Sequence, residues 1–177
     1  VSLHREENVD HPGRLRTLIE ALGDLVRAHD MPAIVSTHPR TRKRIEQAGV
    51  VGDERIRFLK PFGFYDYNHL QMKSFCAISD SGTIAEEASI LGFPAITPRD
   101  AIERPEALDV GCIVMTGVAR EAIVDGVALA TRRFAELGER PMPVPEDYRV
   151  VDTSDRVAAL LLGTARLSND WDGIRRF

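Results

Sequence analysis

The sequence has 177 residues, of which 44% are hydrophobic and 28% are charged, and its formal net charge is −4. This size and composition are typical of one globular domain with a substantial core. The negative charge excludes nucleic-acid binding through overall electrostatics. No apolar run is long enough to span a membrane.

Two cysteines, Cys76 and Cys112, lie inside apolar, strand-like runs and lack the spacing of a metal site. We therefore expect buried, reduced thiols, as in a cytoplasmic protein. The chain begins at Val1 without Met and enters a strand-like run almost at once, so we expect it to be a segment of a longer protein.

Short apolar runs predict six strands that are separated by helical patterns. The strands are residues 1–3, 32–36, 56–59, 75–79, 94–97 and 112–115. The first helix opens at Asp10 and Pro12 and carries an apolar stripe with a 3.6-residue period. Later helices begin with a basic run at Arg40, include Leu70, begin at Ile84, and extend over residues 120–137.

This alternation predicts an α/β fold with a Rossmann-like, doubly wound, six-stranded parallel sheet. The common strand order of such a sheet is 3-2-1-4-5-6, and ligands bind where the order reverses, at the carboxyl ends of strands 1 and 4. One of these ends carries His4 and Arg5, and the other carries Asp80, Ser81 and Gly82. We therefore expect the topology to bring the two polar clusters side by side in one nucleotide site.

The second cluster lies where an apolar strand turns into a helix, so several backbone N–H groups lack intrahelical partners. Together with the helix dipole these donors favour an anion, and Ser81 is the expected N-cap. Gly82 lets a ligand oxygen approach the backbone closely. One carboxylate of the pair Glu86 and Glu87 is expected to accept hydrogen bonds from sugar hydroxyls. This combination indicates a nucleotide, and the alternative is a capped helix with an acidic first turn that binds nothing.

A proline-rich crossing at Pro141, Pro143 and Pro145 separates a final helix from the rest of the chain. Ser154 and Asp155 are the expected caps of this helix, and its apolar side chains predict packing on a neighbouring domain. The predicted organisation is a nucleotide-binding domain over residues 1–140, followed by the crossing and the helix over residues 141–177.

Three stretches resemble the UDP-N-acetylglucosamine 2-epimerase family: residues 4–8 (HREEN), 79–88 (SDSGTIAEEA) and 99–107 (RDAIERPEA). Family members have two Rossmann-like domains that face each other across a cleft, as in the B-type glycosyltransferase fold, and this chain looks like the second domain only. The resemblance implies reversible inversion at C2 of a UDP-N-acetylhexosamine, through elimination of UDP to a glycal and re-addition, in cell-surface polysaccharide biosynthesis. It implies neither an organic cofactor nor a metal.

The resemblance also implies roles for eight residues, by their positions in these motifs. His4 is the implied catalytic residue, near the reacting centre. Ser81, Gly82 and Thr83 are implied to bind the diphosphate, and Arg104 the phosphates or the sugar. Glu87 is implied to bind the ribose hydroxyls, and Tyr67 is implied to lie beside the uracil. Arg5 is also an implied substrate-binding residue, because it matches the first arginine of the family's HRREN motif.

Glu6 stands where the family has an arginine, and this charge reversal beside the site leaves the exact sugar open. The HREEN and THPRTRKR runs look most like the branch that makes UDP-N-acetyl-L-fucosamine from its talosamine epimer. The acid/base carboxylates of the family belong to the first domain, so this chain alone is expected to bind UDP weakly and to catalyse nothing. Full-length members tend to form homodimers, and neither nucleic acid nor a membrane is an expected partner.

Three alternatives share the UDP site: a UDP-sugar glycosyltransferase of the same fold, a hydrolysing epimerase, and a binding module without chemistry. Several single residues also keep two interpretations. His38 is either a strand-capping or cleft-lining residue or a ligand contact, and the basic helix start from Arg40 to Arg44 is expected to be a solvated face. The pair Glu103 and Arg104 could be a salt bridge that orders a loop, although its place at the sheet edge favours a site role.

Overall fold

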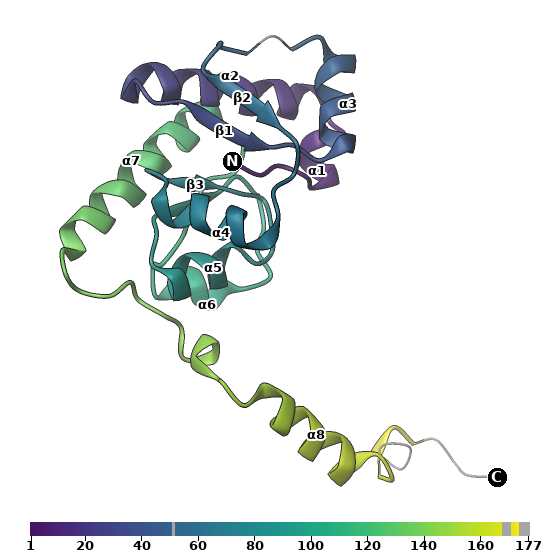
Figure 1. The fold of residues 1–177 in the computed structure, drawn as a ribbon. Helices are drawn as coiled ribbons and strands as arrows, with labels where there is room; N and C mark the ends of the chain where they lie inside the picture. The colour runs from purple at the N-terminus through teal and green to yellow at the C-terminus, as the bar shows by residue number, and fades with distance from the viewer. Residues whose placement is uncertain (51, 168–170, 174–177) are drawn as a thin grey trace. The chain divides into compact units, whose positions relative to one another are not determined.

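The computed structural model describes residues 1–50, 52–167 and 171–173. Contacts between residues divide the chain into two units, Val1–Pro145 and Glu146–Phe177. The first unit contains every strand that the described residues form (Figure 1). No described helix combines the length and the apolar character that crossing a membrane requires.

The strands of the first unit form two short parallel ladders. β1 (Ala33–Ser36) pairs with β2 (Ile56–Leu59), in a register that places Ala33 opposite Ile56. The second ladder has the order β3-β4-β5, with β3 at Ala77–Ile78, β4 at Ala95–Thr97 and β5 at Val114–Met115. Five strands are therefore present in the described residues, and the predicted count of six is wrong.

The missing strand is the predicted one at residues 1–3, which is reduced to isolated parallel bridges from Ser2 to Ser36 and to Ser79. The ladder stops there because the N–H groups of His4 and Arg5 donate to the Asp80 carboxylate instead of to a strand. Ser2 still lies between the two ladders. The spatial order is thus β2-β1-Ser2-β3-β4-β5, which is the predicted 3-2-1-4-5-6 order with the first strand shortened.

Two long helices supply much of the hydrophobic core. α2 (Pro12–His29) and α7 (Arg120–Leu137) lie beside each other in Figure 1 and contact each other. α2 buries the predicted apolar stripe, including Leu15, Leu18 and Leu22, and α7 buries Ile123 and Val127. Hydrophobic periodicity therefore predicts both helices correctly.

Each ladder strand before β5 leads directly into a helix at its carboxyl end. α3 (Pro39–Ala48) follows β1, α4 (Phe64–Lys73) follows β2, α5 (Ile84–Leu91) follows β3, and α6 (Pro105–Asp109) follows β4. The short α1 (Glu6–Val9) follows the Ser2 bridge. The sequence does not predict α1 and α6, which have 4 and 5 residues, because periodicity needs a longer window.

Histidine side chains cap two of these helices. His11 Nδ1 accepts from the N–H of Arg14 at 3.3 Å at the start of α2, and His38 Nδ1 accepts from the N–H of Arg40 at 3.3 Å at the start of α3. His38 therefore caps the start of a helix and not the end of a strand, and its interpretation as a ligand contact stays a prediction. Cys76 is half-buried and Cys112 is buried, and both are free thiols.

The second unit contains a 3₁₀ turn, η1 (Glu146–Arg149), and α8 (Thr153–Thr164). The N-cap of α8 is Asp152, so the expected caps Ser154 and Asp155 lie inside the helix. The apolar side chains of α8 (Val157, Leu160, Leu161 and Leu162) are exposed. Their packing on a neighbouring domain stays a prediction.

Candidate functional site

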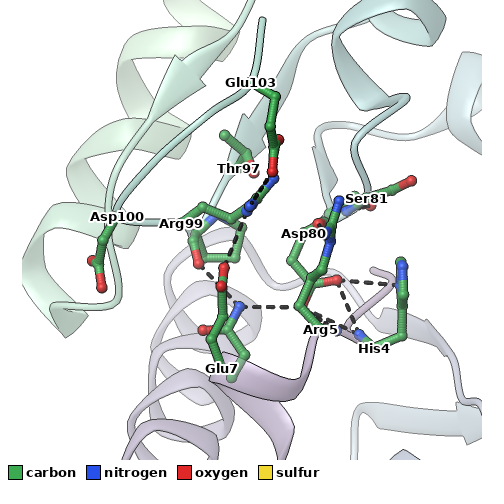
Figure 2. A network of polar contacts seen from close by, with 12 residues as sticks. His4, Arg5, Glu7, Asp80, Ser81, Thr97, Arg99, Asp100 and Glu103 are labelled. Carbon is green, nitrogen blue, oxygen red and sulfur yellow. Dashed lines mark hydrogen bonds and ion pairs between the residues drawn. The ribbon is translucent and has the colours of Figure 1, made fainter. Parts of the chain in front are cut away.

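Asp80 joins the two polar clusters that follow Ser2 and β3 (Figure 2). This residue is completely buried, and its carboxylate accepts hydrogen bonds from the N–H of His4 at 2.9 Å, the N–H of Arg5 at 3.1 Å and the Asn8 side chain at 3.1 Å. A buried carboxylate needs such donors, because burial of an unpaired charge is costly. The structure thus brings His4 and Arg5 next to Ser81, as the topology predicts.

Asp80 also orients the imidazole of His4. His4 Nδ1 lies 3.2 Å from Asp80 Oδ1, and 44% of the His4 side chain is exposed. This contact fixes which edge of the imidazole faces Asp80 and leaves Nε2 on the opposite side of the ring. The structure therefore places a partly exposed imidazole beside Asp80, and the catalytic role of His4 stays a prediction.

The turn after Asp80 differs from the predicted capping arrangement. α5 begins at Ile84, its N-cap position is Thr83, and the prediction that Ser81 is the N-cap is wrong. Ser81 Oγ instead accepts from the N–H of Thr83 at 3.3 Å, in a turn before the helix, and lies 3.0 Å from Thr83 Oγ1. Gly82 and Thr83 therefore separate Ser81 from the first residue of the helix. The hydroxyls of Ser81 and Thr83 both lie at the junction between β3 and α5.

Two guanidinium groups lie against Gly82. A Cβ built on this glycine would lie 3.1 Å from Arg5 Nη2 and 3.5 Å from Arg104 Nη1. The absence of a side chain therefore lets both cations approach the turn. Two guanidinium groups beside the N-terminal turn of a helix form a site suited to a diphosphate.

Ion pairs fix the loop that carries Arg104. Arg104 Nε pairs with Glu86 Oε1 on α5, so Glu86 holds this arginine instead of facing a sugar. The buried Arg99 donates to both carboxylate oxygens of Glu103, at 2.7 and 2.9 Å, and to Glu7 at 3.1 Å (Figure 2). The Arg99 guanidinium lowers the pKa of Glu103 to about 2. Glu103 and Arg104 therefore pair with different partners, and the alternative interpretation of a salt bridge between them is not borne out.

Glu87 lies on α5 with both carboxylate oxygens engaged. Thr83 Oγ1 donates to Glu87 Oε1 at 2.6 Å, and Gln71 Nε2 donates to Glu87 Oε2 at 2.7 Å. These contacts place Glu87 one helical turn from Thr83, on the same side of α5. Sequence reasoning singles out Glu87 but misses Gln71, whose only sequence signal is its position one turn after Tyr67 on α4.

Tyr67 is half-buried on α4. Burial raises the pKa of its phenol, and the side chains of Ser2 and Ser79 oppose that rise by hydrogen bonding. Tyr67 and Gln71 also line an apolar cavity of about 330 Å³ that includes none of the turn residues from Ser81 to Thr83. This cavity is therefore separate from the charged turn, and its apolar lining does not suit a diphosphate.

Glu6, which replaces an arginine of the family motif, points to α3 and not to the turn. Its carboxylate pairs with Arg40 Nη1 at 2.7 Å. Arg40 and Arg44 both pair with Asp10, and these two cations lower the pKa of that carboxyl. The basic start of α3 is thus an ion-paired surface, and the charge reversal at Glu6 is matched by a nearby arginine.

Comparisons with known proteins identify the family of the chain. The model of the UDP-N-acetylglucosamine 2-epimerase family matches residues 1–162. The UDP-N-acetylglucosamine 2-epimerase of Methanocaldococcus jannaschii is 34% identical over 133 residues, which cover 73% of this chain and 36% of that protein. The UDP-2,3-diacetamido-2,3-dideoxy-D-glucuronate 2-epimerase of Pseudomonas aeruginosa is 36% identical over 124 residues, which cover 70% of this chain and 34% of that protein.

The fold is also that of solved epimerases. The crystal structure of the M. jannaschii UDP-GlcNAc 2-epimerase in complex with UDP-GlcNAc and UDP has a TM-score of 0.80 and 30% identity to this chain. The match covers 91% of this chain and 44% of that structure. The α/β fold is thus one half of the two-domain, B-type glycosyltransferase arrangement, and the chain matches less than half of the length of its M. jannaschii relative. On the family match and these identities, the chain belongs to the UDP-N-acetylglucosamine 2-epimerase family.

Proposed function

We propose that this chain is the UDP-binding domain of a UDP-N-acetylhexosamine 2-epimerase. The observation that carries the proposal is the charged turn, where Arg5 and Arg104 flank Gly82 and Asp80 holds His4 beside it. Relatives whose names give 2-epimerase activity on two different UDP-2-acetamido sugars support this reaction class and not glycosyl transfer.

The proposed ligand contacts follow from the chemistry of each side chain. Arg5 and Arg104 neutralise the diphosphate, and the Ser81 hydroxyl and the Gly82 N–H donate to its oxygens, while Thr83, whose hydroxyl donates to Glu87, closes the turn around them. The Glu87 carboxylate accepts from the ribose hydroxyls. Tyr67 lies beside the base.

In the proposed reaction a base removes the proton at C2 and the C1–O bond to UDP breaks, which leaves a glycal. UDP then adds back after a proton is delivered to the opposite face of C2. The arginines and the turn stabilise the negative charge that the departing diphosphate gains. His4, whose Nδ1 contacts Asp80, presents Nε2 near the reacting bond. Carboxylates of another domain are proposed to exchange the C2 proton.

Deuterium incorporation tests the reaction. The complete protein is incubated with UDP-GlcNAc in deuterated water without an acceptor, and the sugar is examined by NMR. The proposal expects deuterium at C2 of recovered UDP-sugar and an approach to an epimer mixture. Unlabelled sugar together with acceptor-dependent release of UDP would instead establish a glycosyltransferase, and net release of UDP with free N-acetylmannosamine would establish a hydrolysing epimerase.

Titration with UDP tests the site separately from the reaction. Glu87→Ala and Ser81→Ala should each weaken UDP binding by about tenfold, because each removes a hydrogen bond to a polar or charged ligand group. Glu121→Ala and Ser154→Ala are matched controls at exposed positions on α7 and α8, and they should leave the affinity within about twofold. Equal affinity in all four variants would remove the site assignment.

The remaining biological context is proposed from the family alone. We place the complete enzyme in the cytoplasm, as a homodimer that acts in cell-surface polysaccharide biosynthesis. The HREEN and THPRTRKR runs suggest the UDP-N-acetyl-L-fucosamine branch as a substrate alternative, but the named relatives do not favour it. An assay of C2 epimerisation with each UDP-2-acetamido sugar decides between these substrates.

A further inference from the structure

Gln71 is the one buried residue of α4 and it is polar. Only 4% of its surface is exposed, whereas its helix neighbours Tyr65 and Met72 are 85% and 48% exposed. Burial of a carboxamide costs free energy unless hydrogen bonds replace those to water. An apolar residue would fill this position at lower cost, so the amide has a function other than packing.

The hydrogen bonds of Gln71 show what that function is. Its Nε2 donates to Glu87 Oε2 at 2.7 Å, across the boundary between α4 and α5. Its Oε1 is buried without a hydrogen-bond partner among the described residues. The reverse orientation of the amide would place Oε1 against the Glu87 carboxylate, where two acceptors repel each other. The contact with Glu87 is thus the single hydrogen bond that the buried side-chain amide makes.

The second oxygen of Glu87 is held from its own helix. Thr83 Oγ1 donates to Glu87 Oε1 at 2.6 Å. Without a ligand, the Glu87 carboxylate therefore already accepts two hydrogen bonds, one from α4 and one from the N-cap residue of α5. A carboxylate has about four lone-pair sites, so two acceptor sites, one on each oxygen, remain for a ligand.

We infer that Gln71 is a positioning residue that sets the orientation in which Glu87 accepts the two ribose hydroxyls of UDP. This inference rests on the proposed function, because it concerns the same UDP site. With the donor of Gln71 in place, the plane of the carboxylate is fixed and each oxygen keeps one lone pair for a hydroxyl. Without that donor, the carboxylate rotates about its last side-chain bond and the pair of acceptors is no longer aligned.

The test measures discrimination between UDP and 2′,3′-dideoxyuridine diphosphate by calorimetric titration of the complete protein. The wild-type protein should bind UDP about tenfold or more tightly than the dideoxy analogue, since the analogue leaves the charged carboxylate without hydroxyl donors. Gln71→Leu and Gln71→Met remove the donor and keep the volume. Each should reduce that ratio to about one third or less, and should leave the affinity for the dideoxy analogue within about twofold.

The controls separate positioning from a structural role. Gln47→Leu makes the same chemical change at an exposed position on α3 and should leave the ratio unchanged. A structural role for Gln71 would weaken the binding of both nucleotides equally, with an unaltered ratio, and that result would overturn the inference. Two variants with different shapes guard against a folding defect in either, which thermal unfolding detects.

The outcomes also separate this inference from the proposed function. If the wild-type protein does not bind UDP, both are wrong. If it binds UDP and the dideoxy analogue equally, Glu87 does not hold the ribose: the inference and the ribose contact of Glu87 are overturned, while UDP binding by the domain stands. If it discriminates between them and the Gln71 variants do so to the same extent, UDP binding stands and the positioning role of Gln71 is excluded.

Discussion

Asp80 and His4 lie 76 positions apart in the sequence and are joined by two contacts, from the His4 N–H at 2.9 Å and from His4 Nδ1 at 3.2 Å. The first contact ends the shortened first strand, and the second orients the imidazole. One buried carboxylate therefore fixes both the backbone and the side chain of the implied catalytic residue. This relationship makes Asp80 a residue on which stability and site geometry depend together.

The first prediction concerns Asp80→Ala. This change leaves three buried or half-buried donors without their acceptor, from His4, Arg5 and Asn8, and should lower the free energy of unfolding by at least about 3 kcal/mol. Urea denaturation measures the loss. Asp100→Ala is the matched control, because that carboxylate is 63% exposed in its pair with Arg14 and should change stability by less than about 1 kcal/mol. Similar losses for both variants would contradict the assigned role of Asp80.

The second prediction concerns Gly82→Ala. The added Cβ would lie 3.1 Å from Arg5 Nη2, so the guanidinium has to move away from the turn. We expect UDP affinity to fall by about tenfold, the effect of one lost charge-assisted hydrogen bond, while the fold stays intact. Gly163→Ala in α8 is the control, because a Cβ at that position would meet no other atom within 4 Å and helix propensity favours alanine. An unchanged affinity in Gly82→Ala would show that Arg5 does not contact the diphosphate.

The third prediction is a pH dependence that arises from Glu103. Its pKa is lowered from 4.5 to about 2 by Arg99, so its ion pair stabilises the fold fully above pH 4.5 and loses this effect as the pH falls toward 2. In Glu103→Gln that contribution is missing at every pH. The difference in unfolding free energy between wild type and variant should therefore shrink from about pH 6 to about pH 2.5.

Glu139→Gln is the control for this pH series. Glu139 is exposed near the end of the first unit, so this variant measures the effect of replacing a surface glutamate by glutamine under the same conditions. Urea titrations at each pH measure both differences. A Glu103 difference that grows as the pH falls would show that Arg99 does not hold the ionised carboxylate in the folded state.

The fourth prediction concerns Glu6, whose pair with Arg40 is exposed: 76% of the Glu6 side chain and 41% of the Arg40 side chain reach solvent. A double-mutant cycle with Glu6→Gln and Arg40→Gln should give a coupling of less than about 1 kcal/mol. UDP affinity in Glu6→Gln should stay within about twofold of wild type, because this carboxylate is paired with α3. A large change in UDP affinity would place Glu6 in the ligand site after all.

Topology is the part of the fold that the sequence predicts best. Alternating apolar runs and helical stripes are enough to place β1 between Ser2 and β2, and β3 between Ser2 and β4. The sixth strand fails for a reason that no local pattern contains. Residues 1–3 are apolar enough for a strand, but the next two N–H groups bond to the distant Asp80 side chain.

In the site, too, the sequence predicts the features that depend on neighbouring residues and misses those that depend on tertiary packing. The motif run from Ser79 to Ala88 identifies the turn and Glu87, because the strand–helix junction is local. It does not reveal that Thr83 occupies the N-cap position, which depends on how the turn after Ser81 closes. The sequence does not identify Gln71 for a different reason. Its burial and its hydrogen bond to Glu87 arise only when α4 packs beside α5.

The Ser2 bridge has a consequence for motion within the sheet. Ser2 donates its N–H to Ile78 at 2.9 Å, its carbonyl accepts from Asp80 at 3.2 Å, and the Val1 carbonyl accepts from Ser36 at 2.9 Å. These few bonds cross between the ladders immediately before His4, so a sliding of one ladder past the other would separate His4 from the turn. A bound nucleotide that touches both sides would resist this sliding, and hydrogen–deuterium exchange at the amides of Ser2, Ser36 and Asp80 should then slow when the site is filled.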